Sequence, residues 1–78
     1  MANTNKKIKA IYRNDTKHYT IHSYYERYNA RQITDFAVWF GDDKFKDLGN
    51  TRGYEDALAL VKLDAGTFGE VLRFEIDS

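Results

Sequence analysis

Hydrophobic residues recur at every second position in four separate runs of this chain, whereas they recur at helical spacing in only one. Alternation is typical of strands that bury one face, because successive side chains of a strand point to opposite sides of a sheet. The alternating runs lie around residues 8–12, 17–25, 33–40 and 72–76. The chain is therefore expected to fold around a sheet.

Turn residues divide these runs. The Asn-Asp pair at residues 14–15 follows the first run, and such residues tolerate the positive φ of tight hairpin turns. The Gly-Asp-Asp sequence at residues 41–43 predicts a second turn, followed by a short strand over residues 44–48 and a loop over residues 49–53.

The single helical stripe predicts a helix that begins near Tyr54 and ends at Gly66, with acidic residues in its first turn. Its apolar positions are Tyr54, Ala57, Leu58, Val61 and Ala65. The predicted fold class is α+β, with an antiparallel sheet of four or five strands and one helix packed on one face. The elements follow the order β-β-β-β-α-β, and the chain is expected to form a single domain over residues 1–78.

Residues 23–32 allow two structures. Ser23 and Glu26 have the spacing of a capping box, which predicts a short helix. Alternatively, the flanking strands extend and turn at residues 28–30. The extended hairpin is favoured, because aromatic residues continue on both sides and no apolar helical stripe is present.

The same segment contains the candidate binding site. Residues 23–31 hold three tyrosines and two arginines, the side chains that most often anchor binding surfaces. The alternative is ordinary strand composition, since tyrosine favours strands. The predicted partner-binding residues are Tyr24, Tyr25, Arg27, Tyr28 and Arg31, assisted by Arg13 and Trp39.

Composition excludes several classes of function. Twelve basic and twelve acidic residues cancel, which argues against binding nucleic acid through the charge of the whole molecule. Basic residues nevertheless outnumber acidic ones over residues 6–31, so nucleic acid is a possible partner of the N-terminal half. The absence of cysteine, of a signal peptide and of a membrane-spanning stretch predicts a cytoplasmic protein without a membrane partner.

No cofactor, metal ion or catalytic site is predicted. His18 and His22 would lie roughly 13 Å apart on a strand, too far for one zinc ion. The carboxylates are scattered over turns, a helix terminus and exposed strand positions, and the glycines do not have the spacing of a phosphate-binding loop. A non-enzymatic protein is therefore expected.

Residues 36–60 resemble AP2-type DNA-binding domains, in which a three-stranded sheet lies in the DNA major groove and a helix packs behind it. The segments that carry the resemblance are Phe36-Ala37-Val38-Trp39-Phe40, Lys44-Phe45-Lys46-Asp47-Leu48-Gly49 and Tyr54-Glu55-Asp56-Ala57-Leu58-Ala59-Leu60. The resemblance implies that Arg13 and Trp39 contact DNA. The chain departs from the family pattern after Arg13, where Asn14-Asp15 replaces the glycine and valine of the family's first strand.

These observations rank three classes of function. An inhibitor or adaptor that sterically occupies a site on a larger protein comes first, a DNA-binding module of AP2-like type second, and an enzyme third. In size and lack of motifs, the chain is similar in kind to anti-defence proteins of phages and plasmids, anti-CRISPR proteins among them. The partner and the oligomeric state are not predicted.

Overall fold

The computed structural model describes residues 4–28, 31–41 and 45–77. It contains five strands and one helix: β1 (Thr4–Ile11), β2 (Thr16–Tyr28), β3 (Arg31–Phe40), β4 (Lys46–Thr51), α1 (Tyr54–Gly66) and β5 (Arg73–Asp77). The predicted α+β class and element order are confirmed.

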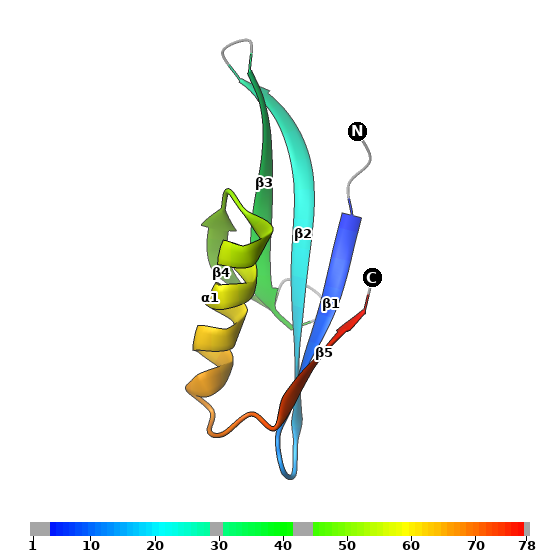
Figure 1. Ribbon diagram of the computed structural model, residues 1–78, viewed down its shortest axis with the longest axis vertical. Coiled ribbons are helices and arrows are strands. Elements are labelled where there is room, and N and C mark those ends of the chain that lie inside the picture. The colour runs from blue at the N-terminus through cyan, green and yellow to red at the C-terminus, as the bar shows by residue number, and fades with distance from the viewer. Residues whose placement is uncertain (1–3, 29–30, 42–44, 78) are drawn as a thin grey trace.

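The strands form one antiparallel sheet in the order β4-β3-β2-β1-β5. Helix α1 covers one face, where it lies against β2, β3 and β4, while β1 and β5 extend beyond it on the other side (Figure 1). The opposite face of the sheet carries no helix and is called the open face below. The molecule is elongated, with extents of 48 × 19 × 19 Å.

The core lies between α1 and the covered face. Successive side chains of a strand point to opposite faces of the sheet, so only every second strand residue can enter the core. Those on the covered face of β1, β2 and β3 include Ile8, Tyr19, Ile21 and Val38. All four are buried, as are the helix residues Ala57, Val61 and Ala65. Small residues at two of these helical positions let the helix approach the sheet closely.

Helix α1 begins and ends where the sequence predicts. Glu55 and Asp56 lie in its first turn, where carboxylates interact favourably with the helix dipole. At its end, the backbone N–H and the hydroxyl of Thr67 both donate to the carbonyl of Asp64. Of the two leucines outside the stripe, Leu60 packs against the core, whereas Leu63 is 73% exposed.

Two tyrosine hydroxyls join the sheet to the end of α1. The Tyr19 hydroxyl donates to Oδ2 of Asp64 at 2.7 Å, and the Tyr12 hydroxyl donates to the carbonyl of Ala65 at 2.5 Å. Burial, followed by the hydrogen bond to the Asp64 carboxylate, raises the pKa of Tyr19 well above its usual value. Tyr19 therefore remains a protonated donor across the neutral range.

The hairpin alternative for residues 23–32 is confirmed, since β2 continues to Tyr28 and β3 starts at Arg31. The predicted strand at residues 44–48 is shifted, because β4 spans Lys46–Thr51 and includes Gly49. A register shift between Val38 and Trp39 accommodates the extra residue, and Gly49 supplies the positive φ of 128°. The predicted turn at residues 42–43 lies outside the described residues.

The last strand differs from its prediction in burial. Phe74 is half-buried, but Leu72 and Ile76 are exposed. The reason is the position of α1, which lies over the strands on the far side of β1 from β5. Within the described residues, no helix is long and apolar enough to cross a membrane.

We expect the Tyr19→Phe variant to lose about 1–3 kcal/mol of unfolding free energy near neutral pH, since it removes a hydrogen bond to a carboxylate. Because the folded pKa of Tyr19 is raised, the wild type should lose this contribution as the pH rises above about 10, the ordinary pKa of tyrosine. The difference in unfolding free energy between the wild type and Tyr19→Phe, measured by urea denaturation, should therefore become smaller as the pH increases. Tyr25→Phe is the control, and a gap of constant size up to pH 11 would contradict this role of Tyr19.

Candidate functional site

The β2–β3 hairpin projects beyond the rest of the sheet. In the described part of the chain, pairing of β1 with β2 stops at Ser23, and pairing of β4 with β3 stops at Phe36. Tyr24–Tyr28 and Arg31–Asp35 therefore pair only with each other, as a two-stranded ribbon that we call the arm. The arm rises above the helix in Figure 1.

The structure divides the predicted binding residues other than Arg13 among three places. Tyr24 lies at the base of the arm on the open face, and Trp39 lies on the same face further down β3. Tyr25, as the next residue of β2, lies on the opposite side. Arg27, Tyr28 and Arg31 belong to the paired backbone of the arm, and their side chains lie outside the described part of the structure.

Arg13 does not join the other predicted residues. It lies in the β1–β2 turn, beyond the last pair Ile11–Thr16, at the end of the molecule opposite the arm (Figure 1). Trp39 is opposite Thr20, and the four residues from there to Thr16 alone span about 13 Å. Arg13 therefore lies apart from Trp39 and from the arm.

Three rings form a stacked row on the open face, which we call the aromatic ladder: Tyr24, His22 and Trp39. The His22 ring lies 5.7 Å from the Trp39 ring with an interplanar angle of 20°, and 6.1 Å from the Tyr24 ring with an angle of 28°. His22 thus joins the two predicted aromatic residues. This role could not be predicted from the sequence, because the stacking depends on the pairing of His22 with Ala37 across two strands.

Hydrogen bonds from both neighbouring strands hold the ladder. The Nδ1 of His22 donates to Oδ1 of Asn5 on β1, and Nδ2 of Asn50 on β4 donates to the Tyr24 hydroxyl at 3.4 Å. Four strands therefore contribute to one row of rings. A partner would meet aromatic side chains whose orientation is already restricted, which lowers the entropy lost on binding.

Charged side chains of both signs lie on the open face. Asp35 is opposite Tyr24 and Asp47 is opposite Trp39, while Arg73 and Glu75 lie further away on β5. By strand register, Lys7, Lys9 and Arg73 share the open face with Asp35, Asp47, Glu75 and Asp77. Arg73 and Glu75 form an ion pair, with 3.0 Å between Nε and Oε2. This face therefore has no excess of positive charge among the described side chains.

The basic residues of the N-terminal half are also distributed rather than clustered. The ammonium groups of Lys6 and Lys17 lie over the rings of Tyr54 and Phe68, on the helix side of the sheet. Lys17 also forms an ion pair with Asp15 at 3.0 Å, and this contact lowers the pKa of the Asp15 carboxyl. The basic character seen in the sequence therefore does not form one surface.

His18 and His22 lie on the same face of β2, four residues apart, as expected for a strand. Among the described residues, no group of three or more histidine, aspartate or glutamate side chains is placed to hold a metal ion. A groove of about 670 Å³ lies between the β1–β2 turn and the loop after α1, and includes Arg13, Lys17 and Phe68. Its Lys17 is already engaged by Asp15 and Phe68.

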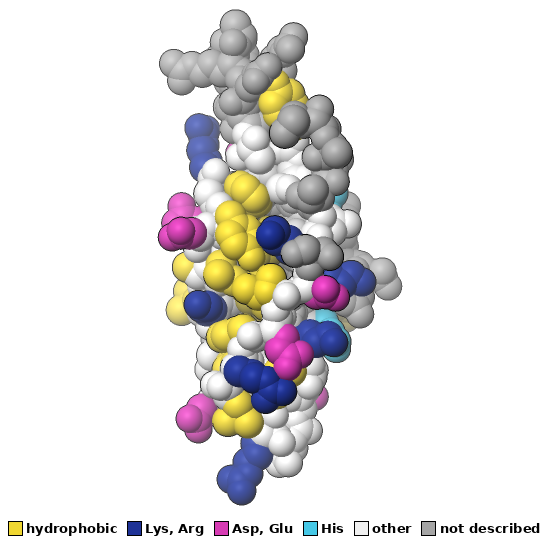
Figure 2. All heavy atoms as spheres, turned by 45° about the vertical axis from the view of Figure 1, so that its right-hand side comes forward, with side chains coloured by type: hydrophobic (Ala, Val, Ile, Leu, Met, Phe, Trp, Pro, Cys, Tyr) yellow, Lys and Arg dark blue, Asp and Glu magenta, His cyan; other side chains and the backbone are white. Residues whose placement is uncertain are grey.

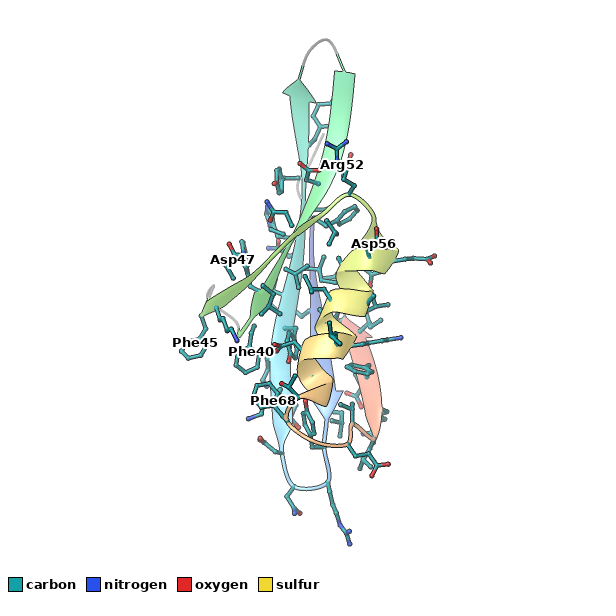
Figure 3. The ribbon with its side chains drawn as sticks, turned by 90° about the vertical axis from the view of Figure 1, so that its left-hand side faces the viewer. Phe40, Phe45, Asp47, Arg52, Asp56 and Phe68 are labelled. Carbon is teal, nitrogen blue, oxygen red and sulfur yellow. The ribbon has the colours of Figure 1, made fainter. Side chains whose placement is uncertain are left out.

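Two further features were not predicted from the sequence. Phe40, Phe45 and Phe68 form a second aromatic cluster at the end of β3 away from the arm. The Phe40 ring lies 5.9 Å from the Phe45 ring and 5.5 Å from the Phe68 ring (Figure 3). Arg52 follows Thr51, which is opposite Phe36, so it lies beside the base of the arm (Figure 3). Arg52 is thus an exposed cation close to the Tyr and Arg cluster.

Comparisons with family models, curated proteins and solved structures gave no match to this chain.

Trp39 is the only tryptophan of the chain, so its fluorescence reports on the aromatic ladder. We expect the His22→Ala variant to shift the emission maximum to longer wavelength, because the loss of the stacked ring admits water to the indole. The control is His18→Ala, which removes a histidine from the same face of β2. Equal emission spectra for wild type and His22→Ala would show that the stack does not form in solution.

Proposed function

We propose that this chain is a small non-enzymatic binding protein that occupies a site on a larger protein partner through the arm and the aromatic ladder. The observation that carries the proposal is a preorganised row of Tyr, His and Trp rings on the helix-free face, which also carries charges of both signs, with Asp35 and Asp47 directly opposite Tyr24 and Trp39. This combination matches the anatomy of protein interfaces, which have an aromatic centre and a polar rim.

The aromatic ladder supports a protein partner because its rings combine apolar area with polar groups. The Tyr24 hydroxyl and the His22 ring are already hydrogen bonded to side chains of neighbouring strands. A partner that packs on these rings therefore removes apolar surface from water, while Nδ1 of His22 and the Tyr24 hydroxyl oxygen can keep these hydrogen bonds.

The arm supports insertion into a recess of the partner. It is a two-stranded ribbon with Tyr24 and Tyr25 on opposite sides of its base and Arg52 nearby, so a partner can contact it from both sides. The remaining tyrosine and arginines of the cluster belong to the same ribbon. Occupation of a recess explains how so small a domain blocks a larger protein, in the manner of the anti-defence proteins that the chain resembles in kind.

DNA binding through the sheet, the AP2-like alternative, receives less support. A sheet that binds phosphates gains affinity from cations, but the carboxylates of Asp35, Asp47, Glu75 and Asp77 stand on the same face as Lys7 and Lys9. The two residues that would contact DNA by resemblance, Arg13 and Trp39, are not adjacent.

The test begins with capture of a partner from a nuclease-treated lysate of the source cells, followed by titration with the purified partner. Tyr24→Ala and Trp39→Ala should each weaken binding at least about fivefold, corresponding to about 1 kcal/mol for an interface anchor. Arg13→Ala, at the other end of the molecule, is the matched control and should leave affinity nearly unchanged. Thermal unfolding of each variant separates lost contact from lost structure.

Salt dependence distinguishes the two functions. Affinity for a protein partner should fall only mildly between low and physiological salt, whereas phosphate binding falls steeply. Duplex DNA binding with a steep salt slope would instead establish the sheet-on-DNA alternative. Full partner affinity in a Tyr24→Ala, Trp39→Ala double variant would show that the partner binds elsewhere.

A further inference from the structure

Strand β5 is an uncovered edge of the sheet. It has β1 on one side and, within the described residues, no strand on the other. The opposite edge, β4, is interrupted by a register shift and by Gly49 at positive φ, irregularities that discourage pairing with another chain. By contrast, β5 pairs with β1 without a register shift, so its outer edge presents a regular row of backbone groups.

On the face of the sheet that carries the helix, the side chains of β5 are apolar and only partly covered. Leu72, the residue before β5, and Ile76 within it are 56% and 48% exposed, and Phe74 lies between them along the chain, under the Lys62 ammonium. Figure 2 shows hydrophobic side chains gathered in a column on this side of the molecule. The strand therefore combines an unpaired backbone edge with exposed apolar side chains.

The sequence of β5 is complementary to itself in one antiparallel register. Opposed residues must lie on the same side of a sheet, so a twofold pairing is centred on a residue. Centring on Phe74 places Arg73 opposite Glu75 and Leu72 opposite Ile76. Centring on Arg73 opposes two arginines, and centring on Ile76 opposes Glu75 to Asp77. Centring on Glu75 makes two Arg73–Asp77 pairs but opposes Glu75 to itself, so only the Phe74-centred register of these four has no like-charge pair.

We propose that a second copy of this chain pairs with β5 in the Phe74-centred register, forming a symmetric dimer with a continuous ten-stranded sheet. Twofold symmetry makes every contact occur twice, so two Arg73–Glu75 pairs lie on the open face. Two Leu72–Ile76 pairs and one Phe74–Phe74 contact lie on the helix side. Opposite-charge and apolar cross-strand pairs both stabilise antiparallel strands.

The charges of β5 select a second copy over other edge strands. Arg73 and Glu75 already form an ion pair along the open face, with 3.0 Å between Nε and Oε2. In the dimer, each Arg73 would lie beside Glu75 of its own strand and opposite Glu75 of the other copy. An unrelated edge strand does not in general carry a cation and an anion at these two positions. The twofold axis reverses the strand direction, so the two arms point to opposite ends of the dimer and both remain accessible.

Charge exchange tests the register. In a dimer of the Arg73→Glu variant, each opposed pair of positions 73 and 75 would consist of two glutamates, and in a dimer of the Glu75→Arg variant it would consist of two arginines. Each variant alone should therefore sediment as a monomer at concentrations where the wild type is dimeric. An equimolar mixture of the two variants should dimerise again, because each Glu then lies opposite an Arg. Both residues are exposed, so circular dichroism should show an unchanged fold. A wild type that is monomeric up to about 1 mM, the limit for weak complexes, would overturn the proposal.

Disulfide trapping provides an independent test, since the chain contains no cysteine. Leu72 and Ile76 are both exposed, and the Phe74-centred register places Leu72 of one copy opposite Ile76 of the other. The two test variants are Leu72→Cys and Ile76→Cys. A mixture of the two single variants should form a crosslinked dimer under mild oxidation faster than either variant alone. Crosslinking that is equally fast in each single variant, or a charge-variant mixture that stays monomeric, would reject this pairing.

Discussion

The arrangement of the molecule depends on the packing of α1 against one face of the sheet, to which Tyr19 contributes both buried surface and a hydrogen bond. Tyr19 lies on the central strand β2, its ring packs 5.1 Å from that of Phe40, and its buried hydroxyl donates to Asp64. Together with the Tyr12–Ala65 hydrogen bond, it holds the helix on one face of the sheet. Because that single helix lies against β2, β3 and β4, the opposite face and strand β5 are left without a helical cover.

Most of the fold could be predicted from the sequence because its signals are local. Alternation identified β1, β2, β3 and β5, and one helical stripe identified α1. The position of β4 was predicted two residues early, because Gly49 was assigned to a loop but lies in a bulged strand. A glycine at positive φ is compatible with a loop and with a bulged strand, and only the pairing of Gly49 with Val38 distinguishes the two.

The candidate site was predicted less completely, because it depends on contacts between strands. Tyr24 and Trp39 were identified by residue type, but His22 became part of the site only through register and stacking. Arg13 belongs to the same basic stretch of the sequence as the Tyr and Arg cluster. In the fold, however, it lies in the β1–β2 turn, at the end of these strands away from the arm. Residue type therefore pointed to Tyr24 and Trp39, whereas the stacking of His22 between them depends on strand pairing.

Hydrogen exchange of the free and partner-bound protein tests the proposed binding surface most directly. Backbone amides of the arm belong to a two-stranded ribbon and should exchange quickly in the free protein. Binding should slow exchange most strongly at Tyr24–Tyr28 and Arg31–Asp35, with smaller changes around Trp39 and little change in α1. Protection that appears in α1 or the β1–β2 turn while the arm continues to exchange at its free rate would contradict the proposed site.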